Sequence, residues 1–144
     1  MVKKADKKIV KKPVIAEKAK LLQKNNYAGF WLRFAAGLID GIILMIIAIP
    51  LSLIGGGMIM LIVGWLYSAL LESSARQATI GKIAMNIKVT DMNSSRISFG
   101  KATARHFSKI ISALILMIGF IMIAFTEKKQ GLHDIIAGSL VVRK

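Results

Sequence analysis

Two long apolar stretches, separated by a proline and a run of glycines, dominate the pattern of the chain. Residues 41–71 contain no Asp, Glu, Lys, Arg or His over 31 consecutive positions, whereas one helix needs only about 20 apolar residues to cross a bilayer. A single helix of that length would measure about 46 Å against a hydrocarbon core of about 30 Å. We therefore predict a helical hairpin with spans near residues 28–49 and 54–74, which reverses between Pro50 and Gly57.

A third apolar stretch, near residues 107–125, is shorter. Its uncharged part covers 16 residues, or about 24 Å of helix, which is marginal for crossing. The pattern leaves two alternatives open, a third crossing and a re-entrant segment. Ser98 is a candidate N-cap for the basic helix that leads into this stretch. Residues 86–90 and 139–142 alternate as strands do, and we predict that they pair.

The predicted fold class is an all-α membrane protein. It comprises a transmembrane helical hairpin, a third membrane-inserted segment, and a small cytoplasmic element made of a strand and an interfacial helix. The chain has 144 residues, of which 55% are hydrophobic, and this share is too high for an ordinary soluble domain of that length. The predicted organisation is a basic tail at residues 1–26 and a membrane domain at residues 27–144.

Basic residues are concentrated outside the apolar stretches. The formal net charge is +14, and residues 1–26 include nine lysines. We predict that this tail is disordered and cytoplasmic, with lysines that bind anionic lipid headgroups; the alternative is a solvated tail that only sets topology. A nucleic-acid partner is not expected, because the aromatic residues lie mostly in or beside the apolar spans instead of alternating with the basic residues on a soluble surface.

The positive-inside rule sets the predicted topology. Seven Lys or Arg residues lie between the second and third stretches, at residues 72–109, and none lies within the hairpin turn. Both flanks of the hairpin are therefore predicted to be cytoplasmic, in a multi-pass protein of the cell membrane. The four basic residues after position 125 favour a cytoplasmic C-terminus and hence a re-entrant third segment.

Enzymatic chemistry finds no support in the sequence. Cysteine is absent, which excludes thiol nucleophiles and thiolate metal sites. No nucleophile with a nearby base and no phosphate-binding loop is recognisable. His133 beside Asp134 does not indicate a metal site, since adjacent helical residues point about 100° apart. We therefore expect no enzyme activity, no metal and no cofactor.

Ionisable residues inside apolar segments are the candidates for function. Arg33 and Asp40 lie on one face of the first span, seven residues and about 10.5 Å apart, so a direct ion pair between them is not expected. Asp134 is a third charge in an apolar setting. One arginine facing two aspartates leaves a surplus negative charge, which a proton, a cation or a further basic group must neutralise. The structural alternative is a buried polar cluster that only fixes helix register.

The contexts of these three residues resemble those of a known family. Arg33 and Asp40 occur in YAGFWLRFAAGLID, and Asp134 occurs in GLHDIIAGSLVV. This ordered trio resembles the RDD family, which is named for one arginine and two aspartates. Gly81 and Lys82 in TIGKIAMNIKV, and the arginine at position 105 in GKATAR, also resemble that family's loop after the second helix and the basic helix that follows it.

The resemblance implies a membrane protein for which transport, including exchange of a monovalent cation for a proton, has been suggested. On this interpretation Asp40, in the middle of the bilayer, alternates between protonated and cation-bound forms, with Arg33 tuning the balance and Gly81, Lys82, Arg105 and His133 in supporting positions. The alternative is a non-transporting accessory or structural subunit of a larger membrane complex. Three short segments can hardly enclose a pathway alone, so we expect either a homo-oligomer or such a complex.

Two further expectations concern single residues. Glu72 and Arg76 stand four positions apart and are predicted to form a surface pair at the end of the second span. His106 is predicted to face headgroups or solvent beside Arg105.

Overall fold

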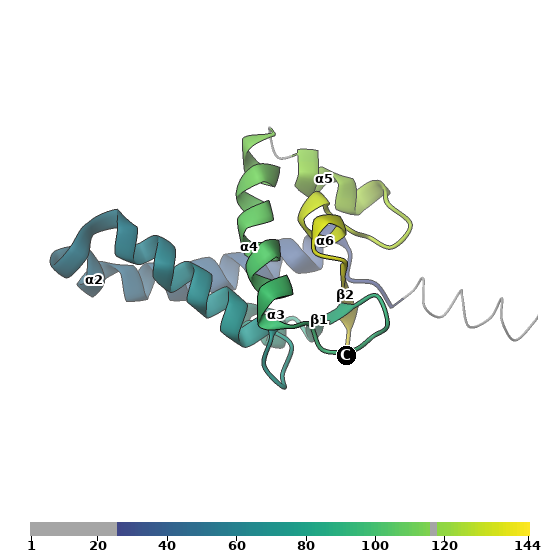
Figure 1. The fold of residues 1–144 in the computed structure, drawn as a ribbon, viewed down its shortest axis with the longest axis horizontal. Helices are drawn as coiled ribbons and strands as arrows, with labels where there is room; N and C mark the ends of the chain where they lie inside the picture. The colour runs from purple at the N-terminus through teal and green to yellow at the C-terminus, as the bar shows by residue number, and fades with distance from the viewer. Residues whose placement is uncertain (1–25, 116–117) are drawn as a thin grey trace, which may run out of the picture.

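The chain is described by a computed structural model in which residues 26–115 and 118–144 are placed, with the backbone alone for residues 52–56. Helices account for most of this structure, and one small sheet accompanies them (Figure 1). The predicted basic tail at residues 1–26 lies, apart from its last residue, outside the described part of the chain.

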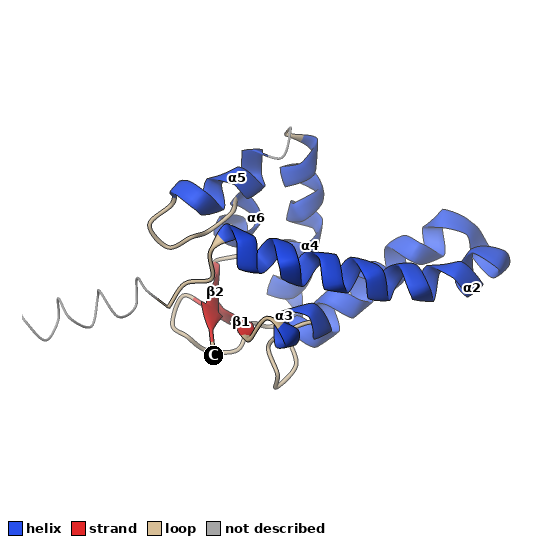
Figure 2. Cartoon of the chain, turned by 180° about the vertical axis from the view of Figure 1, so that it is seen from behind, coloured by secondary structure: helices blue, strands red, loops and turns tan. Residues whose placement is uncertain are grey.

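Among the described residues the first and longest element is helix α2, Phe30–Glu72, which doubles back on itself. Its two limbs, Phe30–Leu51 and Gly57–Glu72, lie side by side in both views (Figures 1 and 2). Pro50, which cannot donate a backbone hydrogen bond, precedes the reversal. The predicted helical hairpin is therefore present.

The outer surface of this hairpin is apolar. Only 6% of the most apolar part of the first limb is buried inside the protein. Large hydrophobic side chains point outward along both limbs, including Trp31, Leu38, Ile42, Met45, Ile46, Met58, Leu61 and Leu70. So large an exposed apolar surface marks a membrane or a protein interface. Within the described residues, Phe30–Leu51 is the one helix whose length and composition allow it to cross a membrane, and a second appears if helices α4 and α5 are counted as one bent span.

Helices α4, Phe99–Leu114, and α5, Ile118–Phe125, occupy the third apolar stretch. Ser98 caps α4 as predicted, because its side-chain oxygen accepts a hydrogen bond from the Lys101 amide. The axes of the two helices differ by 102°. The predicted third segment at residues 107–125 is therefore divided between two helices, the first of which begins earlier, at Phe99, and the bend is compatible with either a broken span or a re-entrant segment.

The sheet joins segments that are far apart in sequence. Strand β1, Ile87–Asp91, pairs antiparallel with strand β2, Ser139–Arg143, with Val89 opposite Val141. The predicted pairing is confirmed. The segment that leads into α2 also joins this layer, since the Ala28 amide donates to the Val141 carbonyl at 2.9 Å.

Two short helices complete the base of the molecule. Helix α3, Ile80–Ala84, packs against α2, and helix α6, Leu132–Ile136, packs against α4. Buried apolar side chains fill the centre of this base, where α2, α4 and the sheet meet: Ala28, Ala36, Ala69, Ile87, Val89, Ile97, Ala102 and Val141. The polar side chains of the candidate site lie above this small core, between the helices.

Candidate functional site

Asp134 lies at the centre of a buried ion-pair network. It is in the first turn of α6, and its side chain has no solvent exposure. Its carboxylate pairs with the guanidinium of Arg33 on one side and accepts a 2.8 Å hydrogen bond from Arg105 Nε on the other. Burial alone would raise the pKa of Asp134, but the two guanidinium groups outweigh it and hold that pKa below its usual range. Asp134 is therefore a fixed anion at neutral pH.

Glu72, the last residue of α2, is the second buried carboxylate. It is 1% exposed, and its two oxygens bind Arg105 Nη1 at 2.7 Å and Lys82 Nζ at 2.8 Å. Lys109 Nζ lies 3.7 Å from it. The predicted surface pair with Arg76 is wrong, because this side of α2 faces α3 and α4, while Arg76 lies beyond the helix end and is exposed.

Asp40 has neutral partners. It accepts hydrogen bonds from the hydroxyls of Tyr67 at 2.7 Å and Thr79 at 2.6 Å, and from the Gly81 amide at 2.7 Å. Gly81 is required for this approach, because a Cβ atom there would lie 2.1 Å from the Ala36 carbonyl oxygen. Asp40 therefore sits against the start of α3.

A continuous polar path connects the two aspartates. From Asp40 it passes to Thr79 at 2.6 Å, and from the Thr79 hydroxyl to Lys82 Nζ at 3.3 Å. It continues through Glu72 to Arg105, and from Arg105 to Asp134. Arg33 ends the path and is fixed further by hydrogen bonds to the backbone carbonyls of Ala28 and Lys129. Both limbs of α2, together with α3, α4 and α6, are thus held by one network.

The charge balance around Asp134 differs from the expected one. Four cationic groups, Arg33, Lys82, Arg105 and Lys109, surround the carboxylates of Glu72 and Asp134. None of the ion pairs among the described residues includes Asp40. Of the three counter-charges left open by the sequence, a further basic group is therefore the one found at Asp134, namely Arg105. Arg33 pairs with Asp134 but not with Asp40, and the ion pairs around Glu72 and Asp134 carry a positive surplus.

Histidine contributes no charge to the network. His133 is 3% exposed, and its ring lies 5.1 Å from that of Phe120. Burial lowers the pKa of His133 to about 3, with the guanidinium of Arg105 adding to the effect, so this imidazole is neutral at physiological pH. His106 is partly buried and packs edge-on against Phe107. Within the described residues no group of His, Asp and Glu side chains has the arrangement of a metal site.

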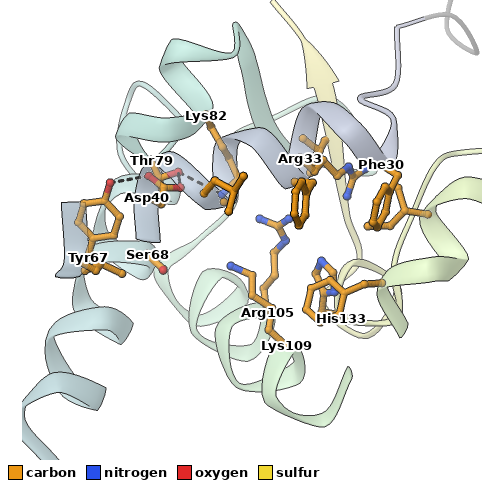
Figure 3. Close-up of a pocket in the computed structure, with 17 residues that line it drawn as sticks. Phe30, Arg33, Asp40, Tyr67, Ser68, Thr79, Lys82, Arg105, Lys109 and His133 are labelled. Carbon is orange, nitrogen blue, oxygen red and sulfur yellow. Dashed lines mark hydrogen bonds between the residues drawn. The ribbon is translucent and has the colours of Figure 1, made fainter. Parts of the chain in front are cut away.

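A cavity of about 360 Å³ brings these groups together (Figure 3). Asp40, Tyr67, Ser68 and Thr79 gather at one end, and the basic side chains of Arg33, Arg105 and Lys109 gather at the other. Lys82 lies between the two ends, with its ammonium group 3.3 Å from the Thr79 hydroxyl. Between them the wall is formed by aromatic and aliphatic side chains, among them Phe30, Phe34, Leu38, Leu44, Phe120 and Ile123.

The structure joins most of the residues singled out in the sequence but divides them between two places. Arg33, Arg105 and Asp134 are in direct contact, and His133 lies beside Asp134. Gly81 contacts Asp40 at the far end of the path. Sequence reasoning missed the roles of Glu72, Tyr67, Thr79 and Lys109. For Glu72 the available signal was the absence of other acidic residues between positions 41 and 90 to neutralise the basic loop.

Comparisons with known proteins agree with the resemblance noted in the sequence. The model of the RDD family matches residues 27–138. Uncharacterized protein YxaI of Bacillus subtilis (strain 168) is 38% identical, over 81% of this chain and 97% of the relative. Uncharacterized protein YckC of the same strain is 34% identical, over 79% and 83%. Uncharacterized membrane protein YteJ, also of that strain, is 32% identical, over 89% and 87%. No solved structure matches.

Proposed function

Since this chain belongs to the RDD family, we propose that it is a multi-pass membrane protein that exchanges a monovalent cation for a proton at Asp40. In each cycle the protonated carboxyl group releases H⁺ as the cation binds the carboxylate, and the reverse step restores the acid. The charge at Asp40 is then neutralised in both states, as a carboxylate in an apolar segment requires.

The proposed topology has two crossings, made by the limbs of α2, and a bent α4–α5 segment that enters and leaves on the cytoplasmic side. The 102° bend between α4 and α5 supports re-entry. The pairing of β1 with β2 supports it too, because the strands before and after this segment must lie on the same side of the membrane. Basic residues on both flanks of the hairpin favour the cytoplasm as that side.

The observation that carries the exchange proposal is the environment of Asp40. This carboxylate lies in an apolar helix, reaches the cavity, and takes part in none of the ion pairs among the described residues. Its side-chain partners, Tyr67 and Thr79, are hydroxyl groups. A hydroxyl can donate to a carboxylate or turn its lone pairs toward a cation, so both states can be accommodated without moving the backbone.

Reconstituted vesicles test the proposal. The full chain is placed in vesicles that enclose a pH-sensitive dye, and Li⁺, Na⁺ or K⁺ is added outside. We expect a cation-dependent pH change with the wild type and none with Asp40→Asn, which keeps the shape of the side chain but loses its charge. Glu127→Gln, at an exposed carboxylate outside the network, is the matched control and should retain the flux. A flux that Asp40→Asn leaves unchanged contradicts the proposal.

Cysteine accessibility tests the topology separately, in a chain that has no cysteine of its own. Gly57→Cys lies near the reversal of α2, and Lys101→Cys and Lys144→Cys lie on exposed positions near β1 and at the C-terminus. An impermeant thiol reagent applied outside intact cells should label the first site alone. Labelling of either of the other two would overturn the proposed orientation.

A second candidate function is an accessory subunit of a larger membrane complex. It is favoured by large hydrophobic side chains that α4, α5 and α6 leave exposed: Ile110, Ile111, Leu114, Ile118, Ile121, Phe125, Ile135 and Ile136. A membrane partner would cover this surface. If wild-type vesicles show no flux for any cation, while the chain co-purifies with a membrane partner irrespective of the Asp40 side chain, this function replaces exchange.

A further inference from the structure

A second site lies at the end of the cavity away from Asp40. Three basic side chains from α2 and α4 converge there, as Figure 3 shows: Arg33, Arg105 and Lys109. Lys82, on α3, lies between this basic end and Thr79. We propose that this basic end binds the phosphate group of an anionic phospholipid, whose acyl chain lies along the apolar wall of the same cavity. The site is separate from Asp40 and does not depend on whether Asp40 exchanges cations.

The first argument is the charge of the basic end. Together with Lys82 beside it, the basic end has four cationic groups that face two carboxylates, Glu72 and Asp134. Both carboxylates are already used in ion pairs with these groups. The result is a formal excess of two positive charges in an apolar surround, which is unfavourable without a counter-ion. A phosphomonoester carries about −1.5 to −2 near neutral pH and offers three acceptor oxygens, so it matches this excess.

The second argument is the position of Lys109. Its one ion pair among the described residues is the 3.7 Å approach to Glu72, which is longer than a hydrogen bond. Its side chain is 29% exposed, compared with 2% for Arg105. The Lys109 ammonium group thus lines the cavity with donors to spare, whereas Arg105 is engaged by both carboxylates.

The third argument distinguishes a lipid from a free phosphate. Phe34 and Leu38 line the cavity, yet they are 49% and 55% exposed on the outer face of α2. The cavity therefore opens toward the apolar surface that faces hydrocarbon in the proposed topology. Gly37, between them, leaves room, because a Cβ atom there would meet nothing within 4 Å. An acyl chain can lie along this wall while its phosphate reaches the basic end, and inorganic phosphate gains nothing from the wall.

Binding to the purified full chain in a nonionic detergent tests the inference. Affinity is measured by calorimetry for three ligands: dihexanoyl phosphatidic acid, dihexanoyl phosphatidylcholine and inorganic phosphate. We expect phosphatidic acid to bind at least tenfold more tightly than either of the others. Phosphatidylcholine lacks a charge-assisted contact and inorganic phosphate lacks the buried apolar segment, and each loss should lower the affinity by a factor of about ten.

Two variants assign the binding to the two parts of the cavity. Lys109→Gln should lower the affinity for phosphatidic acid by about tenfold. Lys101→Gln, at an exposed lysine of the same helix, should leave that affinity unchanged. Gly37→Leu places a side chain in the space for the acyl chain. It should lower the affinity for phosphatidic acid without changing the affinity for inorganic phosphate. The N-terminal lysines are the same in every variant, so headgroup binding by that tail cancels from each comparison.

Each outcome decides the inference. Loss of phosphatidic acid binding in Lys109→Gln and in Gly37→Leu supports it. If only one of these two variants folds, judged by its thermal unfolding, that variant still tests its own end of the cavity. The phosphate site is contradicted if phosphatidylcholine binds as tightly as phosphatidic acid, or if Lys109→Gln has no effect on phosphatidic acid binding. The ligand is not a lipid if inorganic phosphate binds as tightly as phosphatidic acid and Gly37→Leu has no effect on phosphatidic acid binding.

Discussion

Asp40 and Asp134 are the same residue type at the two ends of one polar path, but their surroundings differ. Asp134 has no solvent exposure and is held by two guanidinium groups. Asp40 is half-buried and is held by two hydroxyls and one backbone amide. Asp134 has permanent counter-ions within the chain, whereas the partners of Asp40 are neutral.

This difference separates structural from exchangeable charge. A carboxylate between two buried arginines gains from staying ionised, and its loss leaves uncompensated cations in an apolar interior. A carboxylate held by neutral donors can accept a proton or a cation from outside without leaving another group unpaired. We therefore assign the fold-holding role to the Asp134 end of the path and the exchange role to the Asp40 end.

The largest expected effect comes from breaking the Asp134 end. Asp134→Asn removes the carboxylate that pairs with Arg33 and Arg105, and it should lower the free energy of unfolding by about 3–5 kcal/mol, as when one partner of a buried ion pair is lost. Thermal unfolding in detergent measures this. Asp40→Asn should cost about 1 kcal/mol, in line with a weakened neutral hydrogen bond. Equal losses in the two variants would remove the distinction between the aspartates.

The next effect comes from the contact between Asp40 and α3. Gly81→Ala would place a Cβ atom 2.1 Å from the Ala36 carbonyl oxygen, so α3 must move away from α2 and lengthen its bond to Asp40. We expect a loss of about 1–3 kcal/mol, typical of overpacking. Gly100→Ala, where the nearest atom lies 3.9 Å away, serves as the control and should not destabilise. If Gly81→Ala behaves like the control, α3 does not pack on Asp40.

Acid sensitivity provides a smaller test at the Asp134 end. Burial lowers the pKa of His133 in the folded state to about 3, so from pH 6.5 downward the unfolded chain binds the extra proton. Stability must therefore fall as pH decreases, by about 1 kcal/mol between pH 6.5 and 5.5 from this group alone. Asp134, with its lowered pKa, stays ionised in this range. His133→Asn should flatten the slope of unfolding temperature against pH. An unchanged slope would show that His133 is not buried in its neutral form.

The smallest expected effect concerns Arg76. Because Glu72 binds Lys82 and Arg105 instead, Arg76→Gln should change the free energy of unfolding by less than about 0.5 kcal/mol, like most exposed substitutions. Chemical denaturation in detergent is sufficient to detect a larger value. A loss above about 1 kcal/mol would mean that Arg76 contributes to holding Glu72.

Much of the fold was predictable because its signals are local and strong. The uncharged stretch around Pro50 predicts the hairpin, since no single helix of that length fits a bilayer. The alternation in residues 86–90 and 139–142 predicts two strands, which the structure places at Ile87–Asp91 and Ser139–Arg143, and the basic residues around them predict that both lie on one side. A re-entrant course of the third segment was one of the two alternatives open in the sequence, but the position of the bend between α4 and α5 was not predictable, because residues 110–125 show the same apolar composition on both sides of it.

The site was predictable only in part, because its geometry depends on which elements pack together. Arg33 and Asp134 stand out in apolar surroundings, but pairing Asp40 with Thr79 and Gly81 requires knowing that α3 packs on α2. Glu72 was assigned to Arg76 because helical spacing makes that pair available in any isolated helix. Tertiary contacts with α3 and α4 gave Glu72 buried cations instead, and no local pattern encodes that choice.

The division between the two aspartates is tested most directly by observing both carboxyl groups in one sample. Carboxyl-labelled aspartate can be incorporated into the full chain in lipid nanodiscs and its carbon resonances assigned by single Asp→Asn substitutions. At constant pH 7, we expect addition of monovalent cation to shift the Asp40 resonance and to leave the Asp134 resonance at its ionised position. Cation-dependent shifts at Asp134, or an Asp40 resonance that does not respond to any cation, would contradict the assignment of exchange to Asp40.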